Sequence, residues 1–151
     1  MDWAFDITLK NRKIMAMFLK EFSLEELNKV PEGFNNNIIW NIAHLVATQQ
    51  QLVYGLSGLP MHISNDFLEA YKKGSKPNGD VTQQEVDAIK GLLFSTLEKT
   101  QEDFKKGIFK NYKAYTTSTD STITCVEDAI QFNNFHEGIH LGYILALKKS
   151  L

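Results

Sequence analysis

The chain has 151 residues, of which 43% are hydrophobic and 23% are charged, and its formal net charge is −2 at pH 7. These values are ordinary for one globular domain that is long enough to bury a core, so we expect a single domain over residues 1–151. The near-neutral charge and the absence of a basic stripe argue against nucleic-acid binding, and Arg12 is the only arginine available for bidentate contacts to phosphates or bases.

The amino-terminal segment and the single cysteine bear on where the protein resides. Met1–Asp6 carries acidic residues in place of the basic segment that opens a signal peptide. No stretch approaches the ~18 uninterrupted apolar residues of a membrane span. Cys125 has no second cysteine with which to form a disulfide inside the chain, which is typical of a reducing compartment. We therefore expect a cytoplasmic protein without a membrane partner.

The first part of the chain predicts two long helices. Apolar residues recur at helical spacing over Ile7–Phe22, with Arg12 among the polar residues between them and Asp6 as the N-cap. The segment Ser23–Glu26 has the pattern of a capping box and predicts one short turn of helix. A second long helix is expected over Ile38–Leu56. It contains no charged residue, which favours burial on more than one side.

A connection of about 25 residues follows the second helix and reaches to around Val81. It contains a short helix expected over Asn65–Lys72, and its length is unusual in a compact domain unless it crosses to another part of the fold. A third long helix is expected over Gln83–Lys106, with Asp80 or Thr82 as its cap. The long connection lets this helix pack away from its neighbour in sequence, as in bundles with a crossover.

The last part of the chain is a loop followed by a fourth long helix. The β-branched, hydroxyl-rich segment Ile108–Thr124 predicts a loop with a small hairpin. Thr124 and Glu127 have the spacing of a capping box and predict the start of a helix that runs to about Lys149. The expected fold class is therefore all-α, a four-helix bundle with a long crossover between the second and third long helices.

Two histidines on the fourth long helix, His136 and His140, predict a metal site. Residues four apart on a helix lie on one face, where two imidazoles can bind one ion. That face is the apolar one, and hydrogen bonds to the backbone or to Asn133 are the alternative way to satisfy two buried imidazoles. Two ligands make a weak site, so a further ligand has to come from elsewhere in the chain.

His136, Glu137 and His140 also match the motif of zinc proteases, with Glu137 as the general base. Those proteases need a third ligand downstream, and the eleven residues after His140 contain no His, Asp or Glu. Glu137 and His140 likewise resemble half of a di-iron carboxylate site, but the matching position before His44 holds Asn41 rather than a carboxylate. The residues alone leave the third ligand open between His44 and His62.

The pattern Trp40-x-x-x-His44 on the second long helix, with His136-x-x-x-His140 and a following Leu-Gly on the fourth, resembles the DinB-like superfamily, also called DinB/YfiT-like. The resemblance covers nearly the whole chain, including the long connection. It implies a four-helix bundle in which His44, His136 and His140 bind one divalent ion of nickel, zinc or iron. It also implies a homodimer, and a metal-dependent transferase or isomerase that uses a low-molecular-weight thiol such as bacillithiol or mycothiol.

A divalent ion held by three neutral imidazoles keeps its charge and open coordination positions, so it lowers the pKa of a bound thiol or water. We therefore expect an enzyme that transfers a thiol to an electrophilic small molecule, with Glu137 as a base or as the group that orients a ligand. The alternatives are a hydrolase that uses metal-activated water and a metal-binding bundle without catalysis, as in a stress-related or binding protein. The sequence lacks a basic cluster that would bind a highly anionic thiol.

Several further residues are candidates for smaller roles. Thr48, Gln51 and Asn133 are placed to contact a metal ligand or the substrate, and His62 is expected in a loop near the mouth of the site rather than on the metal. Cys125 lies at the expected start of the fourth long helix, where a helix N-terminus can lower a thiol pKa. A lone cysteine is, however, more often a small buried hydrophobe.

Overall fold

The structure, a computed structural model, describes residues 1–151 and is mostly helical. Its elements in chain order are α1 (Asp2–Glu21), α2 (Leu24–Asn28), α3 (Ile38–Gln50), the π-helical turn η1 (Gln51–Gly55), α4 (Asn65–Tyr71), α5 (Gln83–Lys105), the strands β1 (Tyr115–Thr116) and β2 (Thr122–Ile123), and α6 (Val126–Lys148). These elements confirm the all-α class. None of the helices combines the length and the apolar composition that a membrane span requires.

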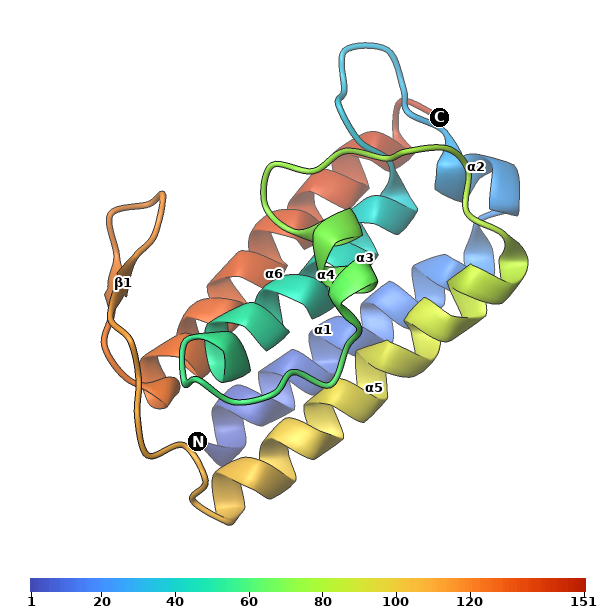
Figure 1. The fold of residues 1–151 in the computed structure, drawn as a ribbon. Coiled ribbons are helices and arrows are strands. Elements are labelled where there is room, and N and C mark those ends of the chain that lie inside the picture. The colour runs from blue at the N-terminus through green and yellow to red at the C-terminus, as the bar shows by residue number, and fades with distance from the viewer.

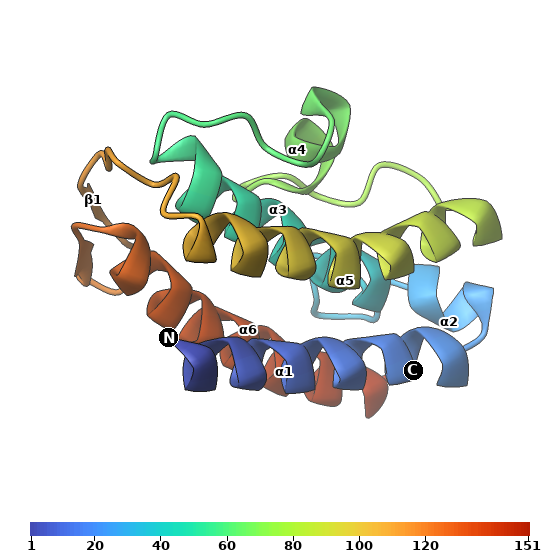
Figure 2. The same cartoon turned by 90° about the horizontal axis from the view of Figure 1, so that it is seen from below.

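The four long helices pack along one another in two layers (Figures 1 and 2). Helices α1 and α6 lie side by side in one layer, and α3 and α5 form the other. Both α1 and α3 contact α5 and α6, so the core lies between the layers. The connection between η1 and α5 runs over the outside of this core, and its short helix α4 lies against α3 (Figure 2). The antiparallel hairpin of β1 and β2 lies at the end of the molecule where α6 begins (Figure 1).

Capping boxes fix where two of the helices begin. Ser23 and Glu26 form the predicted capping box at the start of α2. Thr82 and Glu85 form a second capping box at the start of α5, which confirms Thr82 rather than Asp80 as the cap. After α5, Gly107 adopts a φ of 65°, a left-handed conformation that glycine tolerates and that ends a helix.

The start of α1 differs from the sequence-based expectation. The helix begins at Asp2, so Asp6 is not its N-cap; Asp6 lies inside the helix and forms an ion pair with Lys10. The cause is tertiary packing, because Ala4 and Phe5 are buried in the same apolar cluster as residues of η1 and α6. Burial of these two side chains stabilises an additional helical turn that the local sequence did not signal.

The start of α6 also differs from the expectation. The helix begins at Val126 with Cys125 as the N-cap residue, so Thr124 and Glu127 do not form a capping box. Thr124 instead donates its backbone N–H and its hydroxyl to the Oδ2 atom of Asp128. A carboxylate one residue further along thus takes the place of the predicted partner.

Helix α3 is enclosed by the rest of the fold. Of its residues only Thr48 is not buried, which confirms the expectation drawn from the absence of charge in this segment. The buried set includes Asn41 and His44, which lie off the aliphatic stripe of the helix. The helix passes directly into η1, and a π-helical turn of this kind is frequent at functional sites.

Candidate metal centre

Three histidines from two helices come together where α3 packs on α6. His44 comes from α3, whereas His136 and His140 come from α6, and one ring nitrogen of each lies within 4.8 Å of the others. The ring centroids of His136 and His140 are 4.5 Å apart, and those of His44 and the two α6 histidines are 5.2 and 4.8 Å apart. Together these three residues form a cluster that could hold a metal ion.

Hydrogen bonds orient two of the three rings. The Nδ1 atom of His44 lies 2.7 Å from the carbonyl oxygen of Tyr71, and the Nδ1 atom of His140 lies 2.7 Å from Oδ1 of Asn41. The side-chain NH2 of Asn41 is used in two other hydrogen bonds, so the atom that faces His140 is the oxygen. Because both partners are acceptors, each Nδ1 carries the proton and donates it. The Nε2 atoms are thereby unprotonated, the form in which imidazole binds a metal.

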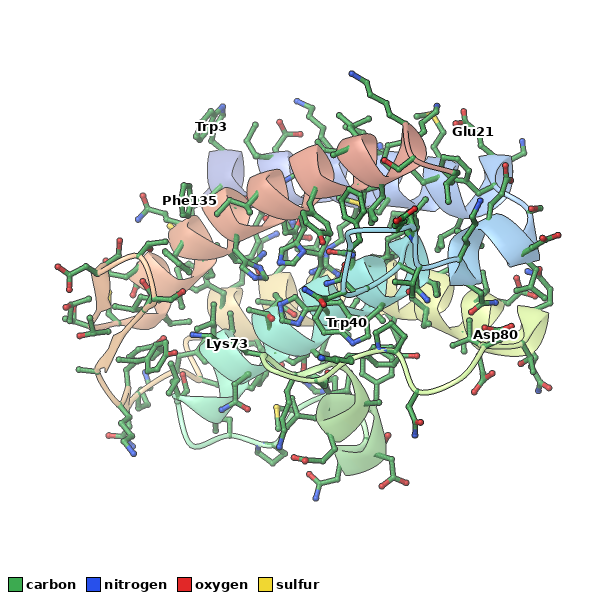
Figure 3. The ribbon with its side chains drawn as sticks, turned by 90° about the horizontal axis from the view of Figure 1, so that it is seen from above. Trp3, Glu21, Trp40, Lys73, Asp80 and Phe135 are labelled. Atoms are coloured by element: carbon green, nitrogen blue, oxygen red, sulfur yellow. The ribbon has the colours of Figure 1, made fainter.

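Two neighbours on α3 also hold His44. The indole ring of Trp40, one turn earlier, stacks on the imidazole with a centroid distance of 4.7 Å and an interplanar angle of 10°. Figure 3 shows Trp40 beside α3, facing the connection that contains α4. One turn later, the Thr48 hydroxyl lies 3.3 Å from Nε2 of His44, so Thr48 contacts a histidine of the cluster. The ring is thus fixed by stacking on one side and by hydrogen bonds at both nitrogens.

Burial keeps the three imidazoles neutral. Burial lowers the pKa of His44, and the hydrogen bond to Tyr71 opposes this only in part. Burial lowers the pKa of His136 to about 3 and that of His140 to about 4, and the neighbouring imidazoles add to both shifts. Metals bind the neutral form of histidine, so the cluster is in the required protonation state at neutral pH.

The donor set and its spacing fit a divalent transition metal. Neutral imidazole suits zinc, nickel and iron. Bonds of about 2.0 Å to zinc place the nitrogens of a tetrahedral site roughly 3.3 Å apart. The three ring nitrogens are within 4.8 Å of one another, so small side-chain rotations would be enough to close the cluster on an ion.

Glu137, the predicted catalytic carboxylate, lies in the core beside the cluster. Its Oε1 atom accepts hydrogen bonds from Nε of Arg12, at 2.8 Å, and from Nδ2 of Asn133, at 3.0 Å. The side chains of Arg12 and Glu137 are both 0% exposed. This ion pair was not predicted, because Arg12 falls among the polar residues of its helix. No local signal in the sequence shows that α1 turns this side chain toward α6.

Four buried side-chain atoms in the chain have no hydrogen-bond partner. They are Arg12 Nη2, Asn133 Oδ1, His136 Nδ1 and Glu137 Oε2. Asn133 and Arg12 both bond to Glu137, which is next to His136 in the chain. With a proton on Nδ1 of His136, two of the four atoms are donors and two are acceptors. Buried polar atoms in proteins are nearly always hydrogen-bonded, so the concentration of four such atoms around the Arg12–Glu137 pair distinguishes this part of the core.

A cavity of about 630 Å³ opens beside the histidines, and all three of them line it. Its walls come from α3, η1, α4, α6 and the β hairpin. Thr48 and Gln51 line the cavity, whereas Asn133 and Glu137 do not. A cleft of this size suits a small organic ligand.

Two other candidate residues lie apart from the cluster. His62 is held against α5, with its Nε2 atom 3.4 Å from Oδ2 of Asp103, and it does not line the cavity. His62 thus lies in a loop and outside the cluster, as expected, but it is not part of the cavity wall. At Cys125, the backbone N–H of Asp128 lowers the thiol pKa, but burial and the carboxylates of Asp128 and Glu127 raise it by more. The pKa of Cys125 is raised, so the lowering that a helix start can produce is outweighed here.

The family model of the DinB superfamily matches residues 8–144. This chain belongs to the DinB superfamily. The match spans α1 to α6 and includes all three histidines of the cluster, which confirms the resemblance seen in the sequence. A comparison with curated proteins gives no match. For this member of the DinB superfamily, the reaction therefore has to be inferred from the site.

We predict that the metal-free protein loses stability as the pH falls from about 6.5 toward 4. In the unfolded chain the histidines take up protons near pH 6.5, whereas in the folded protein His136 and His140 have pKa values of about 3 and about 4. The unfolded state therefore binds more protons in this range. Stability that is fully present above the unfolded pKa is lost as the pH falls toward the folded values.

Urea denaturation at about pH 7.5 and about pH 5 measures this loss as a change in the free energy of unfolding. The variant His136→Gln/His140→Gln removes the two groups with the largest shifts and should show a smaller loss. An equal loss in the variant and the wild type would contradict the assignment.

Proposed function

We propose that this DinB-superfamily protein is a divalent-metal-dependent enzyme and that His44, His136 and His140 are its metal ligands. The observation that carries the proposal is the orientation of neutral imidazoles on the wall of an open cavity, with Nδ1 of His44 and of His140 engaged in hydrogen bonds. We further propose that the four long helices form a four-helix bundle whose crossover is the connection through α4. In that arrangement α3 presents His44 to α6.

When bound, a divalent ion supplies a positive charge that lowers the pKa of a thiol or of water. Three protein ligands leave at least one coordination position for a small-molecule ligand. Thr48 lies on the cavity side of His44, so its hydroxyl is placed to turn from Nε2 toward such a ligand. Tyr71 and Asn41 would hold the two rings in place during this exchange, because they bond to the opposite nitrogens.

Among metal-dependent reactions, we propose transfer of a low-molecular-weight thiol, such as bacillithiol or mycothiol, to an electrophilic small molecule. Sulfur would form a bond to the electrophilic carbon, the thiol proton would pass to solvent, and the leaving group would depart with its electron pair. The resemblance to the DinB-like superfamily supports this reaction, and the open cavity gives the reactants access to the histidines. The alternatives are hydrolysis by metal-activated water and metal binding without catalysis.

We propose that Glu137 positions His136. The carboxylate is fully buried, paired with Arg12 and absent from the cavity wall, so a role through its neighbour fits better than direct contact with substrate. Beyond burial and the neighbouring imidazoles, the positive charge of Arg12 contributes to the lowered pKa of His136, so the buried pair acts on this ring. Such a pair beside the ring would restrict its orientation and help to leave Nε2 for the metal.

For the metal itself, we predict one divalent ion per chain in untagged wild-type protein after loading with zinc, nickel or iron and desalting. His44→Ala should lose stoichiometric metal, because it removes one of three ligands. His62→Ala is the matched control and should keep it, since His62 lies outside the cluster. Elemental analysis makes the measurement. Wild-type protein that carries no stoichiometric ion under any loading condition would contradict the proposal.

For Glu137, we predict that Arg12→Met/Glu137→Met folds but binds metal about 10–100-fold more weakly. Replacing a buried ion pair by apolar side chains of similar volume is often neutral for stability. Removing one partner alone destabilises the protein, because it leaves a buried charge without a partner. Competition with a chromophoric chelator gives the affinity, and thermal unfolding gives the stability. If the folded double variant binds metal as tightly as wild type, Glu137 does not act through His136.

For the reaction, we predict metal-dependent turnover of a chlorobimane with at least one thiol from a panel of bacillithiol, mycothiol, glutathione and coenzyme A. His44→Ala should reduce the rate to the uncatalysed level, and His62→Ala should not. Fluorescence of the thioether product measures the transfer. No metal-dependent turnover with any thiol would count against transfer, and turnover of an ester without thiol would favour the hydrolase instead.

A further inference from the structure

The cavity beside the histidine cluster has mainly apolar walls. Six of its large apolar side chains come from η1 and the residue after it, from α4 and from α6: Leu52, Leu56, Leu68, Phe132, Phe135 and Ile139. Phe135 and Ile139 are 53% and 49% exposed. Apolar surface that is uncovered at a concave site usually marks the place where a ligand binds. A ligand that reaches the histidines would cover these side chains.

The charged residues that line the cavity lie on or just after α4. They are Glu69, Lys72 and Lys73. Lys72 forms an ion pair with Glu69, so these two charges satisfy each other. Lys73 is exposed and takes part in no ion pair or hydrogen bond of the structure (Figure 3). The cavity therefore offers a ligand one uncommitted positive charge.

The β hairpin supplies neutral polar groups to the same cavity. Three hydroxyl-bearing residues that follow β1 line the cavity: Thr117, Ser118 and Thr119. Hydroxyl groups can donate to an anionic oxygen or accept from a donor, but they cannot neutralise several charges. A ligand with many charged groups would have to place some of them against apolar walls without a partner, which is unfavourable.

We propose that the cavity takes a ligand with three features: one donor atom for the metal, an apolar body about the size of an aromatic ring, and a single negative charge for Lys73. The proposal rests on the proposed metal site for the donor atom. It narrows the substrate class to aryl or alkyl compounds with one carboxylate or sulfonate. Polyanionic thiols should bind poorly, so of the two thiols named above bacillithiol, with the two carboxylates of its malate group, fits this cavity less well than mycothiol.

Thiol binding to the cobalt(II)-loaded protein tests the ligand class, because the sulfur-to-metal absorption band reports coordination. Benzyl mercaptan should bind at least about tenfold more tightly than 2-mercaptoethanol, since it buries an additional ring. 4-(Mercaptomethyl)benzoate should bind more tightly still at low salt, and mercaptosuccinate should bind more weakly than benzyl mercaptan. Equal affinities for benzyl mercaptan and 2-mercaptoethanol, or tightest binding of mercaptosuccinate, would overturn the proposal.

Single substitutions locate the two subsites. Phe135→Ala should weaken the binding of benzyl mercaptan about tenfold and leave the binding of 2-mercaptoethanol unchanged. Lys73→Ala should weaken the binding of 4-(mercaptomethyl)benzoate about threefold at low salt and leave the binding of benzyl mercaptan unchanged. Met17→Ala and Lys13→Ala are the matched controls, because both residues are exposed on α1 and neither lines the cavity. Equal effects of the cavity and control variants would place the ligand elsewhere.

A second experiment distinguishes an error in the proposed ligand class from an error in the proposed metal site. The probe 1-anilinonaphthalene-8-sulfonate has an apolar body and one negative charge, and its fluorescence reports binding to metal-free protein. Wild type should bind it, and Phe135→Ala and Lys73→Ala should each weaken it. If cobalt(II) does not bind but this pattern holds, the metal proposal fails and the ligand class stands. If the probe does not bind, or binds all variants equally, the ligand class is wrong.

Discussion

Imidazoles that are largely withdrawn from water carry a charge only at a cost, and their N–H groups need acceptors; this constraint shapes the centre of the molecule. Burial lowers the pKa values of His44, His136 and His140, so all three are neutral bases. Each neutral ring then has one N–H donor and one acceptor nitrogen. The surrounding fold satisfies the donor of two rings with oxygen atoms and turns the three rings toward one another.

The partners that meet this constraint come from distant parts of the chain. Asn41 on α3 accepts from His140 on α6, and the carbonyl oxygen of Tyr71 at the end of α4 accepts from His44. The connection through α4 therefore has a structural reason for its length, because it returns to α3 and supplies this carbonyl group. A shorter link between α3 and α5 would leave the Nδ1 proton of His44 without this acceptor.

Helix α6 serves several functions on different faces. One face carries His136 and His140, and another buries Glu137 against Arg12 of α1. Phe135 and Ile139, between the histidines and solvent, form part of the cavity wall. Helix α6 thus buries Asn133 and Glu137 in the core and holds His136 and His140 half-buried at the cavity. These polar residues occupy positions where apolar side chains could pack, which is typical of a functional centre.

Much of the fold could be predicted from local sequence, whereas the surroundings of the site could not. Hydrophobic spacing and capping residues predicted the bounds of α3 through η1, α4 and α5 to within one residue. The start of α1 was missed because it depends on tertiary burial of Ala4 and Phe5. The pair at His136 and His140 was evident from spacing, but only the family resemblance singled out His44 over His62.

The hydrogen-bonding partners of the histidines were beyond prediction for a physical reason. His44 donates to the backbone carbonyl group of Tyr71. Every residue type has such a group, so the sequence does not indicate this contact. Asn41 was noticed only as the absence of a carboxylate, although it proves to be the acceptor that orients His140. Arg12 reaches Glu137 across 125 positions of sequence, and nothing in its own helix distinguishes it from a surface residue.

We propose above all that the Nε2 atoms of His44, His136 and His140 bind one ion while their Nδ1 atoms keep their protons. Long-range proton–nitrogen correlation spectra of ¹⁵N-histidine-labelled protein, recorded with and without zinc, test this claim at each ring. The account predicts that zinc shifts the Nε2 signals of these three residues, that each keeps a protonated Nδ1, and that His62 does not respond. Coordination through Nδ1 of His44 or His140, or a zinc response that leaves any of the three unchanged, would contradict it.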